Sequence, residues 1–258
     1  LILIVTILAG CTSGLIGPGT GVSKELADNR FNNISQVRYK LHFSIPDHID
    51  SLVHGNAQIN FELKNRETLW LDFLHDSINP VNSLIVNGVL VKPEIVDEHL
   101  VISKRVLKKG KNEVKVDFLA GEQSLNRRED FLYTLLVPDR ARTLFPCFDQ
   151  PDIKAVYELS LDLPEGWVAM SNAPSASREA DFIRFAPSDP LPTYLFSFVA
   201  GLLNEHTVKS GERSISIFHR ETLPYRIAQC DTIGSQIFSS LNWLEDYTGI
   251  DYPFLKYD

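Results

Sequence analysis

Residues 142–155, RTLFPCFDQPDIKA, hold the closest grouping of side chains that could do chemistry in this chain of 258 residues. Two carboxylates, Asp149 and Asp152, are three positions apart, and paired carboxylates can act as a general acid and a general base. Each also lies near a proline, in a setting where Asp accepts hydrogen bonds from nearby backbone amides. We therefore predict that the stretch is a structural corner and that Asp149 bonds to local backbone.

Other catalytic patterns do not occur in the printed sequence. It contains no H-E-x-x-H, G-x-S-x-G, P-loop or G-x-G-x-x-G motif, and no two of its seven histidines are four residues apart. Its three cysteines, Cys11, Cys147 and Cys230, form no C-x-x-C pair. We predict that Cys147 and Cys230 are buried free thiols, because free cysteine is among the most buried residue types. Export would allow the alternative, a disulfide between them.

The charge balance is acidic. The chain has 33 Asp and Glu against 25 Lys and Arg, which gives a formal net charge of −8. The nearest approach to a basic run is Lys108, Lys109 and Lys111, which we predict to be a solvated hairpin turn. Because phosphate binding needs clustered cations, no nucleic-acid partner is expected. Hydrophobic residues make up 44% of the chain, as in a globular domain with a core.

Alternating apolar and polar residues dominate from about residue 37 to residue 220. Such alternation is typical of strands with one buried and one solvated face. Asn87-Gly88 separates two short apolar runs, which predicts a two-residue hairpin. The predicted fold of this region is an antiparallel β-sandwich or a saddle-shaped sheet. The clearest alternating segments are residues 39–45, 57–63, 114–118 and 157–163.

A different period begins near residue 225. Apolar residues recur every three or four positions up to residue 247, which predicts an amphipathic helix. Gly249 ends this helix, and Pro253 prevents it from resuming. Either the helix covers the sheet, or it opens a second domain. Its apolar positions are Ile227, Cys230, Ile233, Ile237, Leu241, Leu244 and Tyr247.

The first ten residues, LILIVTILAG, are almost wholly apolar. As a helix they would span about 15 Å, which is half of a bilayer core and fits the apolar region of a signal peptide. The run ends in Leu8-Ala9-Gly10-Cys11, which resembles the lipobox of bacterial lipoproteins, so Cys11 is the predicted lipidation site. This predicts an exported, membrane-anchored lipoprotein, periplasmic or on the cell surface. The alternative is a buried strand in which Cys11 stands by chance.

Four blocks of the chain, in order, resemble signatures of the aminopeptidase N-type (gluzincin) zinc metallopeptidases. The family signatures are R-x-x-FPCFDEP-x-x-KA, SN-x-P, STYL…G and YFGIPYP. Together the four blocks make the resemblance specific, and it extends over about residues 37–258. The matching blocks here are RTLFPCFDQPDIKA (142–155), SNAP (171–174), PTYLFSFVAG (192–201) and YTGIDYP (247–253).

The resemblance implies a mainly β fold, in which a saddle-shaped antiparallel β-sandwich N-terminal domain precedes a C-terminal helix. That helix would begin a missing thermolysin-like catalytic domain. The implied divisions are residues 1–22, a lipoprotein signal segment and flexible tether; residues 23–222, the β-rich domain of aminopeptidase N type; and residues 223–258, the start of a truncated catalytic domain.

The same resemblance implies a function. In the family, the G-x-M-E-N loop and the zinc-binding H-E-x-x-H motif follow this point. The fragment alone would therefore hold no zinc and be inactive, and it would form one wall of a peptide-binding cavity. The complete protein would be a zinc-dependent aminopeptidase acting on peptide substrates outside the cytoplasm, with its own catalytic domain and a membrane, through the lipid anchor, as partners.

One departure from the family concerns the substrate pocket. The family commonly carries Gln-x-Glu ahead of the first signature, and its Glu contacts the free amine of the peptide. Leu135 and Val137 occupy these positions here, so they are candidate pocket residues without either polar group. Two alternatives therefore stay open: a non-catalytic homologue, or a surface β-sandwich lipoprotein that acts as a binding scaffold. An intact downstream H-E-x-x-H would favour the peptidase.

Overall fold

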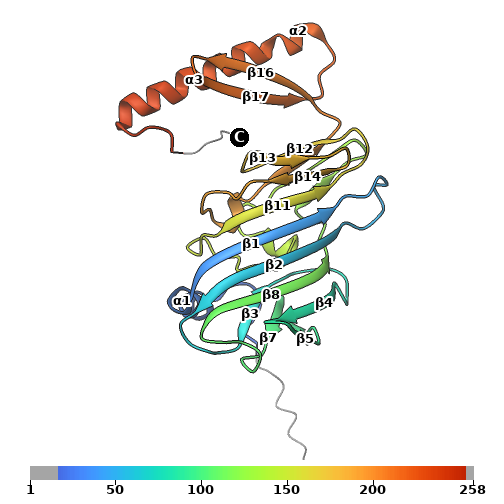
Figure 1. Ribbon diagram of the computed structural model, residues 1–258, viewed down its shortest axis with the longest axis vertical. Helices are drawn as coiled ribbons and strands as arrows, with labels where there is room; N and C mark the ends of the chain where they lie inside the picture. The colour runs from blue at the N-terminus through green and yellow to red at the C-terminus, as the bar shows by residue number, and fades with distance from the viewer. Residues whose placement is uncertain (1–16, 254–258) are drawn as a thin grey trace, which may run out of the picture.

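The computed structural model describes residues 17–253, which form a mainly β molecule with helices at both ends of its long axis (Figure 1). A large sheet runs through its middle. The order of its eight strands is β13 (Ser175–Arg178), β14 (Phe182–Phe185), β11 (Val156–Asp162), β1 (Ile34–Ser44), β2 (His54–Leu63), β8 (Gly110–Leu119), β4 (Val81–Val86) and β5 (Val89–Val91).

Three smaller sheets accompany it. A four-stranded sheet has the order β12 (Val168–Ser171), β15 (Phe198–Gly201), β10 (Phe131–Thr134) and β9 (Leu125–Arg127). A three-stranded sheet has the order β3 (Leu69–Asp72), β7 (His99–Ile102) and β6 (Ile95–Val96), and a hairpin joins β16 (Asn204–Ser210) to β17 (Arg213–His219). The helices are α1 (Lys24–Asn33), α2 (Pro224–Ile227) and α3 (Gln229–Thr248), and the short 3-10 turns are η1 (Ala141–Thr143) and η2 (Thr193–Leu195).

The core lies between the large sheet and the smaller ones. Phe43 of β1 packs against Phe198 of β15, with ring centroids 5.3 Å apart, and Phe118 of β8 packs edge-on against Phe73, which follows β3. The inward positions of the alternating strands are buried, so β1, β2, β8 and β11 confirm the four predicted alternating segments. The mainly β, sandwich-like fold is therefore as predicted.

Strand pairing follows the predicted antiparallel pattern with one departure. Among the pairs of residues 17–253, only β1 and β11 run parallel, with Tyr39 opposite Tyr157. The hairpin predicted at Asn87-Gly88 joins β4 to β5. Both turn residues have positive φ, 51° and 82°, which glycine adopts at no steric cost and asparagine tolerates.

Helix α1 was not expected from the alternating pattern. Its Ser23 cap accepts a hydrogen bond from the Leu26 amide at 3.2 Å, which satisfies one of the free amides of the first turn. The helix buries Leu26 and the charged residue Arg30. Its buried positions therefore do not repeat with the apolar period that predicts a helix.

The C-terminal helix forms as predicted, but it buries only part of the predicted stripe. Helix α3 lies beside the β16–β17 hairpin at one end of the molecule (Figure 1), and it buries Cys230, Gly234 and Phe238. Gly234 allows close approach, because a Cβ there would come within 2.6 Å of Val208 in β16. The predicted apolar positions Ile233, Leu244 and Tyr247 are exposed instead, as is Trp243, which stacks on Tyr247.

Candidate functional site

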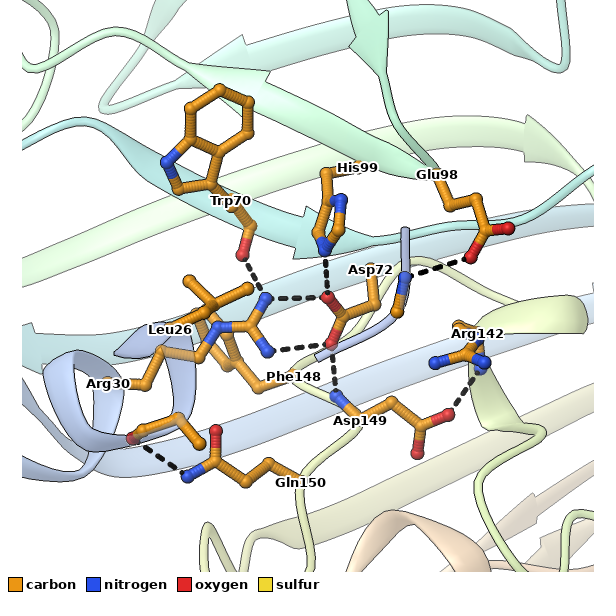
Figure 2. A network of polar contacts seen from close by, with 12 residues as sticks. Leu26, Arg30, Trp70, Asp72, Glu98, His99, Arg142, Phe148, Asp149 and Gln150 are labelled. Atoms are coloured by element: carbon orange, nitrogen blue, oxygen red, sulfur yellow. Dashed lines mark hydrogen bonds and ion pairs between the residues drawn. The ribbon is translucent and has the colours of Figure 1, made fainter. Parts of the chain in front are cut away.

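The corner at residues 142–155 is built on a buried ion pair (Figure 2). Asp72, at the end of β3, accepts hydrogen bonds from both terminal nitrogens of Arg30, at 2.8 and 2.6 Å. Arg30 also donates to the Trp70 carbonyl at 2.7 Å, and His99 Nε2 lies 3.0 Å from the Asp72 carboxylate. The backbone amide of Asp149 completes the set by donating to Asp72 at 2.7 Å. This arrangement joins α1, β3, β7 and the corner.

The electrostatics of Asp72 fit a structural anchor. Burial alone would raise the pKa of its carboxyl, but the His99 contact and the Arg30 guanidinium outweigh burial and hold the pKa of Asp72 below its ordinary value. Asp72 therefore stays charged at neutral pH beside a buried cation. The sequence offered no signal for this trio, because Arg30 and Asp72 are 42 positions apart and no motif contains them.

Asp149 has the role predicted for it. Its carboxylate accepts from the Arg142 backbone amide at 3.1 Å and from the Thr193 hydroxyl at 2.6 Å. Burial raises the pKa of Asp149 above its ordinary value, although both of these bonds oppose the shift. Asp152 is exposed on the turn while Asp149 is buried, so the two carboxylates do not form an acid–base pair.

Cys147 is fully buried within the same corner. Its backbone exchanges hydrogen bonds with Asp72 at 2.8 and 3.1 Å. Burial, with the carboxylates of Asp149 and Asp72 nearby, raises the pKa of the Cys147 thiol well above its ordinary value, which keeps it an unreactive thiol. Cys230 is also buried and free, so the prediction of two buried free thiols is confirmed.

The blocks that carry the family resemblance meet in space. Thr193, in the PTYL block, bonds the Asp149 carboxylate in the corner. Asn172, in the SNAP block, donates to the Leu195 carbonyl at 2.9 Å and accepts from the Ser197 amide at 2.8 Å. Three of the four blocks thus fix one another, through the side-chain bond between Thr193 and Asp149 and through bonds of the Asn172 side chain to backbone, which is a structural role.

The two predicted pocket residues lie on an exposed apolar row. The alternation of β10 continues past its end into the turn that begins at Val137, so Tyr133, Leu135 and Val137 are exposed while Leu136 is buried. Leu135 and Val137 are 49% and 51% exposed. Tyr133 is opposite Val199 of β15, which extends the row across the four-stranded sheet. We call Tyr133, Leu135 and Val137 the apolar row.

The larger hollows of the described residues lie elsewhere. A groove of about 480 Å³ crosses the outer face of the large sheet between Lys40, Asp117 and Arg184. A second, of about 290 Å³, lies between β12, β14 and the β16–β17 hairpin. Neither includes Leu135 or Val137.

Metal and membrane features can be judged only over residues 17–253. Within this range, no group of three or more His, Cys, Asp or Glu side chains is arranged to hold a metal ion. The seven histidines do not cluster, and His99 contacts the Asp72 carboxylate. No helix in the same range is long and apolar enough to cross a membrane. The predicted lipidation site, Cys11, lies outside the described residues.

Comparison with known proteins shows the family to which the chain belongs. A family model described as the Peptidase M1 N-terminal domain matches residues 35–195, which include the corner, the apolar row, the first two signature blocks and the start of the third. The chain belongs to this family. Its fold is also found in yeast LTA4 hydrolase, with a TM-score of 0.71 over 88% of this chain and 37% of that one at 17% identity. An M1 zinc metallopeptidase from Deinococcus radiodurans gives a TM-score of 0.57 over 71% of this chain and 46% of that one, also at 17% identity.

Particular relatives are aminopeptidases by name. The chain is 32% identical to an aminopeptidase N of Streptomyces lividans over 133 residues, which are 50% of this chain and 15% of that protein. It is 28% identical to leucine aminopeptidase 2-2 of Scheffersomyces stipitis over 191 residues, which are 72% of this chain and 27% of that protein. The chain thus spans a small part of the length of these relatives.

Proposed function

We propose that this chain is the N-terminal, non-catalytic part of a zinc-dependent aminopeptidase and that it forms one wall of the peptide-binding cavity. The observation that carries the proposal is the apolar row within a domain of the M1 peptidase family. Leu135 and Val137 are half-exposed, and the Leu135 amide donates to the Ser124 carbonyl, so this segment offers apolar contact to a peptide.

The zinc would come from outside residues 17–253, because no side-chain set in that range fits it. When bound, such an ion polarises the scissile carbonyl and activates a water. Tyr133, Leu135 and Val137 would contact the peptide through apolar surface and exclude water from it. The wall would thus supply shape and not charge at the end where the peptide amine lies.

The exposed side of α3 supports a further packing partner, the chain's own catalytic domain. Ile233, Leu244 and Tyr247, three of the seven predicted apolar positions, stay exposed on α3. Leu244 and Tyr247 lie beside exposed Trp243, which stacks on Tyr247, and clustered exposed apolar residues of this kind mark interaction surfaces in soluble proteins. In the proposal, residues 223–258 begin the catalytic domain, and these side chains become buried in it.

The proposal also places the protein outside the cytoplasm, held to a membrane by acylation of Cys11. The apolar run before Cys11 supports this. Expression of the precursor in a bacterium, with Cys11→Ser as the comparison, tests it. We expect the wild type in the membrane fraction and a lower share of the Cys11→Ser variant there, because the variant has no thiol to acylate. Equal membrane retention of both would overturn the anchor.

The peptidase assay separates the proposal from its competitor. We expect the complete protein to cleave unblocked aminoacyl reporter peptides, and a chelator to abolish this cleavage. The competitor is a non-catalytic homologue that uses the domain as a binding scaffold, and the absence of a carboxylate at positions 135 and 137 favours it. No chelator-sensitive cleavage of unblocked or N-acetylated peptides would establish the scaffold.

A further inference from the structure

One end of the molecule carries a set of cations that the acidic composition hides. We call Lys92, Lys104, Arg105, Lys108, Lys109 and Lys111 the basic edge. All six are exposed, and none forms an ion pair with another residue of the described range. Residues 87–112 hold these six cations against three anions, in a chain whose net charge is −8.

Two asparagines hold the basic edge in one shape. Asn112 is buried, and its side chain bonds the Lys108 amide and the Lys108 and Gly110 carbonyls, each at 2.8 Å. Asn87, in the β4–β5 turn, donates to the Val106 carbonyl at 2.8 Å and to the Asn112 side chain at 3.0 Å. The cationic loop and the hairpin therefore form one rigid unit.

The same unit exposes apolar side chains. Leu90 and Val89, on the edge strand β5, are 74% and 50% exposed. Exposed leucine and valine on a hairpin beside unpaired cations give the two components of membrane-surface binding, apolar insertion and attraction to anionic headgroups.

The chain also enters the fold at this end. A Cβ on Gly17, the first described residue, would lie 2.9 Å from Val96 and 2.5 Å from Asp97, in the turn between β6 and β7. The Gly21 amide donates to the Glu98 carboxylate at 3.2 Å in the same turn. Strand β7 covers about 13 Å before the cationic loop begins. Figure 1 shows β3, β4, β5 and β7 together at the end of the long axis opposite α3.

We propose that the basic edge, with Val89 and Leu90, is a contact surface for an anionic lipid bilayer. The inference deepens the proposed membrane attachment, because it gives the tethered domain a defined orientation. Gly17, which follows the almost wholly apolar run of residues 1–10 in the sequence, lies against the β6–β7 turn at the same end of the molecule. The acidic remainder of the protein is repelled by the same headgroups, so the basic edge faces the bilayer and α3 faces away from it.

Vesicle binding of the 258-residue chain, with Cys11→Ser in every sample to exclude acylation, tests the surface. Partitioning is measured on phosphatidylcholine vesicles with and without phosphatidylglycerol. Each Lys or Arg at an anionic surface contributes about fivefold to binding. Because these contributions multiply, we expect the replacement of Lys104, Arg105, Lys108 and Lys109 by Gln to lower binding to the anionic vesicles by about 600-fold. Salt at about 1 M, which shortens the Debye length to about 3 Å, should do the same to the unsubstituted chain.

Matched variants separate the surface from general charge. The control replaces four other exposed, unpaired cations, Arg128, Lys154, Arg184 and Lys209, by Gln. Leu90→Ser should weaken binding to both vesicle types. Ile78→Ser, at an exposed isoleucine that precedes β4, should not. Equal losses in the two charge variants would overturn the proposal, as would tighter binding to a DNA duplex than to the vesicles. Because Cys11→Ser and the apolar run of residues 1–10 are common to every sample, the differences between variants depend neither on acylation nor on peptidase activity.

Discussion

The buried pair of Arg30 and Asp72 yields the sharpest prediction about stability. Replacing Asp72 by Asn leaves the Arg30 guanidinium buried without its counter-ion, and breaking such a pair costs about 3–5 kcal/mol of unfolding free energy. Arg30→Met leaves the Asp72 carboxylate buried without its cation, although His99 and the Asp149 amide still contact it. The double variant buries neither charge, so it should be more stable than the sum of the single losses predicts, by at least about 2 kcal/mol.

Urea unfolding of the four proteins at neutral pH measures this coupling. The pH dependence gives a second readout with a defined sign. Because the folded pKa of Asp72 is depressed, its contribution is fully present above the unfolded pKa of about 3.9 and is lost as the pH falls through the lower folded value. The difference in unfolding free energy between wild type and Asp72→Asn should therefore decrease only below about pH 4. Additive losses, within about 0.5 kcal/mol, would refute the reasoning.

Three further predictions concern packing and reactivity. Gly121→Ala should destabilise the protein by more than about 2 kcal/mol in the same urea assay, because its Cβ would lie 1.9 Å from the Thr143 carbonyl oxygen in the corner. In a Cys11→Ser background, a thiol reagent should label neither Cys147 nor Cys230 in the folded protein and both in urea; rapid native labelling of Cys147 would contradict its burial. Gly234→Ala should push α3 away from Val208 and raise the labelling rate of Cys230 but not of Cys147; unchanged rates at both would show that the helix tolerates the methyl group.

The alternating strands could be predicted from the sequence because one face of each is exposed to solvent. In β1, buried Tyr39, Leu41 and Phe43 alternate with Lys40 and His42, and this period survives in the fold. The Asn87-Gly88 turn could also be predicted, because the positive φ values of a two-residue hairpin turn favour Asn and Gly.

Long-range polar pairing could not be predicted. Helix α1 is held by Arg30 reaching Asp72, and an isolated charge in a polar stretch gives no period. The buried stripe of α3 was misplaced because Gly234, which has no side chain to count as apolar, allows the closest approach to β16. The apolar row was located through the resemblance at Leu135 and Val137, and alternation alone adds Tyr133 to it.

The most direct test of the proposed cavity wall is the Michaelis constant of the complete protein carrying Val137→Glu. A carboxylate at this half-exposed position would face the ammonium group of an unblocked peptide. A charged hydrogen bond is worth about 1.5–3 kcal/mol, so the Michaelis constant for unblocked reporters should fall by about tenfold or more. Val137→Gln, of the same size without the charge, should have little effect, and N-acetylated reporters should gain nothing from either change. A Michaelis constant that Val137→Glu leaves unchanged, or lowers equally for both kinds of reporter, would contradict the account.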